Sequence, residues 1–70
     1  SKEGLEKIKP DIENTLELLN SLIVDQKKRQ KTLQEELETL ETRYRVGEVS
    51  LEQYEKRKRE LTEELEKIWA

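Results

Sequence analysis

The chain has 70 residues, of which 44% are charged and 31% are hydrophobic, and its net charge at pH 7 is −3. A chain this short buries only about 60% of its unfolded surface, so this composition excludes a multi-domain protein and a large globular core. Cysteine and histidine are absent, which excludes disulfides, thiolate or imidazole metal sites, and catalysis by either side chain.

Residues 1–10 precede the first strong pattern, and we treat them as a lead-in. Pro10 suits the first turn of a helix, where the missing N–H group costs nothing. Leu5 and Ile8 are apolar, so a short helix, a frayed end and a kinked helix that continues through Pro10 all fit the sequence. These three alternatives stay open.

The strongest pattern begins at Ile12, where apolar or amide side chains recur at alternating spacings of four and three residues. This is a heptad repeat, whose first (a) and fourth (d) positions face a partner helix. The a positions are Leu16, Ile23, Gln30, Leu37 and Tyr44, and the d positions are Ile12, Leu19, Gln26, Leu33 and Leu40. The repeat predicts one helix over residues 11–45. Such a helix would be roughly 50 Å long and would need a partner along its length.

A turn follows this long helix. Gly47 can adopt the left-handed conformation that closes a helix C-terminus. Ser50 and Gln53 have the spacing of a capping box, in which each residue satisfies an N–H group of the other. Val49 and Tyr54 occupy the two positions of a hydrophobic staple. These cues predict the start of a second helix.

The second helix is predicted over residues 51–68, with Leu51, Lys58 and Leu65 at a positions and Tyr54, Leu61 and Ile68 at d positions. A short turn between two heptad helices implies an antiparallel hairpin. We therefore expect an all-α fold, an antiparallel two-helix coiled-coil hairpin with one long and one shorter helix. In the predicted register Leu40 faces Tyr54. The flanking positions then carry opposite charges, in the pairs Glu36–Arg57 and Arg29–Glu64.

The second helix is too short to cover the first. It reaches back to about Gln26, so residues 11–25, which we call the arm, have no partner within the hairpin of residues 26–70. The arm is the most apolar part of the chain, and an apolar helical face in water indicates an association surface. The residues predicted to contact a partner are Ile12, Leu16, Leu19, Leu22, Ile23, Gln26, Gln30, Ile68 and Trp69.

Two kinds of protein partner fit the arm. In a homodimer with antiparallel arms, Ile12 would face Gln30 of the second copy and Leu16 would face Gln26. Alternatively, the arm is acidic and could lie in the basic-rimmed groove of a different protein. We expect the homo-oligomer, with a dimer favoured.

The polar and aromatic residues near the ends of the hairpin have two interpretations each. Gln26 and Gln30 could select register or oligomeric state, or they could mark a locally wet seam where the hairpin ends. Tyr44 and Tyr54 are expected to clamp the turn. Trp69 lies off the a and d positions, and we expect it to contact another chain.

Other functional classes fit the sequence less well. The basic clusters at residues 27–29 and 56–59 could bind phosphate, but the net charge is negative and glutamates face both clusters, so nucleic-acid binding is the weaker alternative. A two-helix rod offers no concave site, so we expect neither enzymatic activity nor a cofactor. The sequence has no segment long enough to span a membrane, and the acidic arm does not suit a membrane surface. We expect a cytoplasmic protein.

The segment 37–65 reads LETLETRYRVGEVSLEQYEKRKRELTEEL, with paired leucines, a G-E-V-S turn, Y-E, basic residues and spaced leucines. The residues that carry this pattern are Leu37, Leu40, Gly47, Glu48, Val49, Ser50, Tyr54, Glu55, Lys58 and Leu61. The segment resembles the short C-terminal domain of many prokaryotic proteins, and it is similar to hairpin segments in the coiled-coil regions of archaeal cell-division proteins. The resemblance implies an oligomerisation or docking module of a prokaryotic protein, with an archaeal origin implied by the second similarity.

Overall fold

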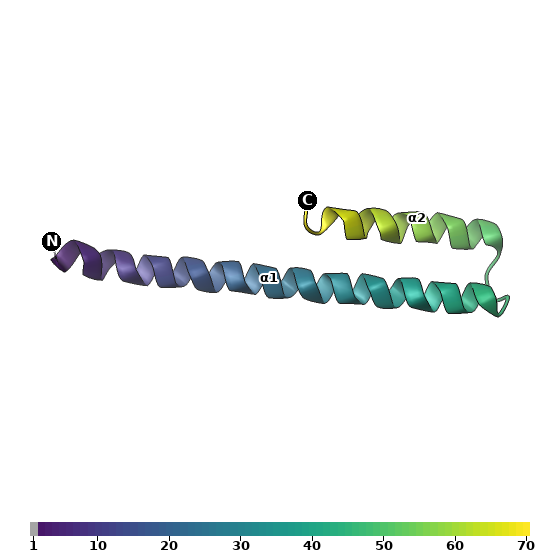
Figure 1. The fold of residues 1–70 in the computed structure, drawn as a ribbon, viewed down its shortest axis with the longest axis horizontal. Coiled ribbons are helices and arrows are strands. Elements are labelled where there is room, and N and C mark those ends of the chain that lie inside the picture. The colour runs from purple at the N-terminus through teal and green to yellow at the C-terminus, as the bar shows by residue number, and fades with distance from the viewer. Residues whose placement is uncertain (1) are drawn as a thin grey trace.

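The chain folds into an elongated antiparallel helical hairpin (Figure 1). The structure, a computed structural model, describes residues 2–70. Helix α1 spans Lys2–Arg45 and helix α2 spans Leu51–Lys67. The molecule measures 69 × 17 × 9 Å, because the 44 residues of α1 form one continuous helix. Helix α2 packs along only the C-terminal half of α1. The predicted all-α class and the hairpin are confirmed.

Helix α1 continues through Pro10 without ending there. Proline has no N–H group, so the carbonyl of Glu6 loses its usual helical partner at this position. Good helix formers on both sides, mainly Glu, Lys and Leu, favour continuation of the helix. The predicted lead-in is therefore part of α1 from Lys2 onward, while Ser1 lies outside the described residues. We call residues 2–25 the extended arm.

The turn closes α1 with the hydrogen bonds of a Schellman motif. Gly47 has φ = 82°, in the left-handed region that glycine adopts without steric cost. The N–H group of Glu48 donates to the carbonyl of Arg43 at 2.9 Å, and the N–H group of Gly47 donates to the carbonyl of Tyr44 at 3.1 Å. These bonds satisfy two carbonyls that a helix end otherwise leaves unpaired. The predicted role of Gly47 is confirmed.

Helix α2 begins with the predicted capping box. The Oγ atom of Ser50 accepts from the N–H group of Gln53 at 3.1 Å, and Oε1 of Gln53 accepts from the N–H group of Ser50 at 3.0 Å. The two staple residues Val49 and Tyr54 are both half-buried. The second helix therefore starts where the sequence predicts.

Removing the cap should weaken the hairpin. We expect Ser50→Ala to lower the free energy of unfolding by about 1 kcal/mol, because the N–H group of Gln53 loses its acceptor. Thermal unfolding followed by circular dichroism measures this loss. The matched control is Ser21→Ala, on the exposed surface of α1, where alanine should be neutral or slightly stabilising. Equal losses in the two variants would contradict a capping role for Ser50.

A small apolar core joins the two helices. The buried hydrophobic side chains among the described residues are Leu33, Leu61 and Ile68, and the partly buried Leu37, Leu40 and Leu65 pack against them. All six occupy predicted a or d positions. The heptad pattern therefore identifies the core of the hairpin.

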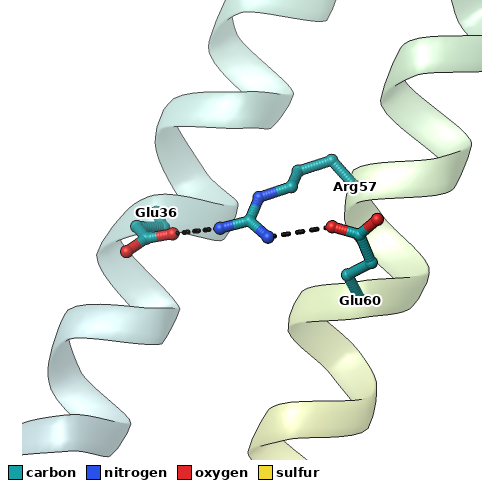
Figure 2. Close-up of polar contacts among 3 residues, drawn as sticks. All are labelled: Glu36, Arg57 and Glu60. Carbon is teal, nitrogen blue, oxygen red and sulfur yellow. Dashed lines mark hydrogen bonds and ion pairs between the residues drawn. The ribbon is translucent and has the colours of Figure 1, made fainter.

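Arg57 links the two helices through its guanidinium group (Figure 2). Its Nη2 atom lies 2.8 Å from Oε2 of Glu36 in α1, and its Nη1 atom lies 3.0 Å from Oε2 of Glu60 in α2. The hydrogen bond with Glu60, followed by that with Glu36, raises the pKa of Arg57 above its ordinary value. The predicted Glu36–Arg57 pair is confirmed. Because these side chains are nearly half exposed, each pair contributes about 0–1 kcal/mol and informs register more than stability.

Two stacked tyrosines hold the helices together near the turn. The ring centroids of Tyr44 and Tyr54 are 4.3 Å apart and their planes differ by 11°. Lys58 donates from Nζ to the hydroxyl of Tyr54 at 3.1 Å, which raises the pKa of the lysine, and the same atom lies 3.9 Å from Glu41. The predicted clamp is confirmed. However, the predicted register places Leu40 opposite Tyr54. In the structure Tyr54 stacks instead on Tyr44, which lies one helical turn beyond Leu40.

Candidate association surface

The apolar side chains of the arm face solvent. Helix α2 ends beside Gln26, and the N-terminal half of α1 extends beyond it without cover (Figure 1). The exposed fractions of five side chains predicted to contact a partner lie between 45% and 59%: Ile12, Leu16, Leu19, Leu22 and Ile23. These side chains form one apolar face that no other part of the described chain covers.

The apolar face extends further toward the N-terminus than the predicted arm of residues 11–25. Leu5 is 69% exposed and Ile8 is 52% exposed, and both lie on the same continuous helix as the arm. Leu5 lies seven residues before Ile12 and therefore continues the d positions of the heptad repeat. That spacing could have identified Leu5. However, three conformations of residues 1–10 fit the sequence, so Leu5 was not assigned to the apolar face.

The residues that directly follow α2 dock onto two glutamines of α1. The Nε2 atom of Gln26 donates to the carbonyl of Ile68 at 2.9 Å, and the Nε1 atom of Trp69 donates to Oε1 of Gln30 at 3.3 Å. Ile68 is only 6% exposed, whereas Trp69 is 54% exposed. These four residues, expected to contact a partner, thus make contacts within the chain, and Ile68 belongs to the hairpin core instead of the free surface. The glutamines close the open end of the hairpin.

The contact of Gln26 should hold the end of α2 in place. We expect Gln26→Ala to accelerate amide hydrogen exchange in the last turn of α2 roughly fivefold, because a hydrogen bond of this kind contributes about 1 kcal/mol. Nuclear magnetic resonance measures this exchange for each amide. The control variant is Gln34→Ala, at an exposed position of α1. Unchanged exchange near Ile68 in the Gln26 variant would show that the bond has no role in holding this end.

The polar side of the arm carries only negative charge. No lysine or arginine lies between Pro10 and Gln26, where the charged residues are Asp11, Glu13, Glu17 and Asp25. A shallow hollow on the arm is lined by Asp11, Ile12, Thr15 and Leu16. The Oγ1 atom of Thr15 donates to the carbonyl of Asp11 at 2.9 Å, so this hydroxyl has a partner within its own helix. The arm can therefore pack against another helix without leaving this hydroxyl unpaired.

Among the described residues, no group of three or more His, Cys, Asp or Glu side chains could hold a metal ion. Over residues 2–70, neither helix is long and apolar enough to cross a membrane.

In the basic cluster 56–59, Arg57 and Lys58 contact glutamates of α1, as the charge-neutralising interpretation expects.

Comparisons with known proteins leave the family open. No family model matches the sequence, and no curated protein or solved structure is significantly similar to the chain. The resemblance of residues 37–65 to prokaryotic and archaeal hairpins therefore stays a prediction.

Proposed function

We propose that the chain is a non-enzymatic coiled-coil assembly module that self-associates through the apolar arm. The observation that carries the proposal is the row of exposed apolar side chains on α1 beyond the end of α2. Full burial of an aliphatic side chain contributes about 1.5–3 kcal/mol, so covering this row gives a stronger drive than any surface ion pair.

The hairpin alone has little apolar burial to stabilise it. The fully or nearly buried side chains of its core are Leu33, Leu61 and Ile68. Helical scaffolds of this size usually need oligomerisation or another constraint. Association through the arm would supply that burial and would couple stability to protein concentration.

The charges around the arm favour a second copy in antiparallel orientation. Basic residues flank the acidic stretch on both sides, with Lys7 and Lys9 before it and Lys27 and Lys28 after it. A parallel pair would set the two acidic stretches side by side. An antiparallel pair brings basic residues of one copy toward the acidic stretch of the other, which lowers repulsion.

Multi-angle light scattering tests the proposal. We expect a mass of twice the 8.4 kDa of one chain at micromolar concentration, retained at high salt because apolar burial is not screened. Nucleic-acid binding, the weaker alternative, would instead fall steeply as salt rises. A monomeric mass at every concentration would refute self-association and would leave docking to a different protein as the use of the arm.

A further inference from the structure

We infer that the extended arm of a second copy packs against the extended arm of the first, end to end with α2. The two extended arms then overlap over their whole length, with Ile12 of one copy facing Leu16 of the other. This inference rests on the proposed self-association and specifies its geometry. It places the N-terminal end of each α1 against the C-terminal end of the α2 of the other copy.

The register expected from the sequence conflicts with the contacts of α2. That register places Ile12 of the second copy opposite Gln30 and Leu16 opposite Gln26. In the structure both glutamines bond to the residues that directly follow α2, where Ile68 is buried against α1. A second helix in that register would need the face of α1 that α2 already covers.

A shift of roughly two heptads, or about 14 residues, removes the conflict and keeps each a position opposite a d position. The second copy then covers α1 only up to the point where α2 ends, and its Lys2 meets the end of α2 beside Gln26. The pairs of facing residues in this register are Ile12 with Leu16, Leu5 with Ile23, and Lys9 with Leu19. The extended arm of a second copy is therefore long enough to cover the whole extended arm of the first.

The shifted register also covers apolar side chains outside the a and d positions. Ile8 and Leu22 both occupy g positions, which face each other in an antiparallel pair, and each is 52% exposed in the single chain. In this register Ile8 of one copy lies beside Leu22 of the other. Thr15 meets its own copy near the two-fold axis, where its hydroxyl is already bonded to the carbonyl of Asp11.

The charges fit this arrangement at most positions. Lys9 occupies an a position opposite Leu19 of the other copy, and its long side chain can extend from there to the polar side of that helix, whose charged residues between 17 and 25 are acidic. The C-terminal end of α2, with Lys67 in its last turn, meets the N-terminal end of the other α1, with Glu3 in its first turn. Opposite helix ends and opposite charges attract. The one like-charged contact is Glu13 with its own copy, an exposed pair that costs at most about 1 kcal/mol.

Distances between spin labels test the register. The natural sequence lacks cysteine, so Asn14→Cys and Ser21→Cys each give one labelling site per chain, both exposed and both at f positions. Pulsed electron paramagnetic resonance should find the Asn14 labels closer together than the Ser21 labels. The reason is that Asn14 lies at the two-fold axis, whereas the two copies of Ser21 are offset along the rod by about 21 Å.

Each other result identifies what fails. In the register expected from the sequence, the Ser21 labels would be closer together than the Asn14 labels. In a parallel pair, or in an antiparallel pair shifted by only one heptad from that register, the two distances would be equal. Either result, in a protein that light scattering shows to be dimeric, overturns the register and leaves self-association standing. A labelled chain that is helical by circular dichroism but monomeric, like the unlabelled chain, overturns both proposals.

Discussion

The double variant Leu19→Glu, Ile23→Glu is expected to be monomeric at concentrations where the proposed self-association would make the natural chain dimeric. The two side chains are 50% and 45% exposed in the single chain and occupy a d and an a position of the apolar row. Association would lose their burial in both copies and would have to desolvate carboxylates. We expect a loss in affinity of at least about a thousandfold, which corresponds to about 4 kcal/mol. Light scattering over a concentration series measures it.

The matched control is Leu18→Glu, Val24→Glu, which adds the same charge to the same helix. Leu18 and Val24 are 62% and 54% exposed and lie outside the a, d and g positions. This variant should remain dimeric. Equal dissociation of the two variants would show that added negative charge, and not the apolar row, controls association. Circular dichroism of both variants checks that α1 stays helical.

Leu61→Ala should detach α2 from α1. Leu61 is the most deeply buried side chain described, at 1% exposure, and it packs with Leu33 and Ile68. Truncation of a buried leucine to alanine costs about 2–5 kcal/mol, which is comparable with the stability expected for a hairpin of this size. The fluorescence of Trp69 reports the loss, because its indole contacts Gln30 only when α2 is docked.

Leu51→Ala is the control for this substitution. Leu51 lies in the first turn of α2 and is 54% exposed, so the same truncation removes little burial and should change the melting temperature only slightly. If both alanine variants melted at the same temperature as the natural chain, the core of the hairpin would lie elsewhere.

The parts of the fold that follow local rules were predictable from the sequence. Gly47 and the pair Ser50–Gln53 are determined by backbone conformation and by the N–H and C=O groups at helix ends, which depend on a few neighbouring residues. The opposite charges of Glu36 and Arg57 identified a contact across the hairpin in the same way.

Features that depend on the whole chain were not determined by the sequence pattern. Pro10 fits both the first turn and the interior of a helix, and only the flanking helix formers decide between them. Tyr54 stacks on Tyr44 because two aromatic rings gain more from contact than either gains from an aliphatic side chain at the expected position.

Only part of the candidate association surface could be predicted from the sequence. The spacing identifies the exposed row of the arm, because α2 is visibly shorter than α1 in the sequence. The role of Gln26 and Gln30 depends on where the backbone of α2 ends and on which way the carbonyl of Ile68 points. Heptad spacing contains no information about either.

The difference in length between the two helices has a consequence for the shape of the proposed dimer. With the arms paired about Asn14, the two Gly47 turns would lie at opposite tips of a single rod, separated by roughly 100 Å. Each tip would present the same tyrosine-stacked loop in the opposite direction. Such a rod would act as a molecular spacer, holding whatever is attached at its tips at a fixed distance and facing apart.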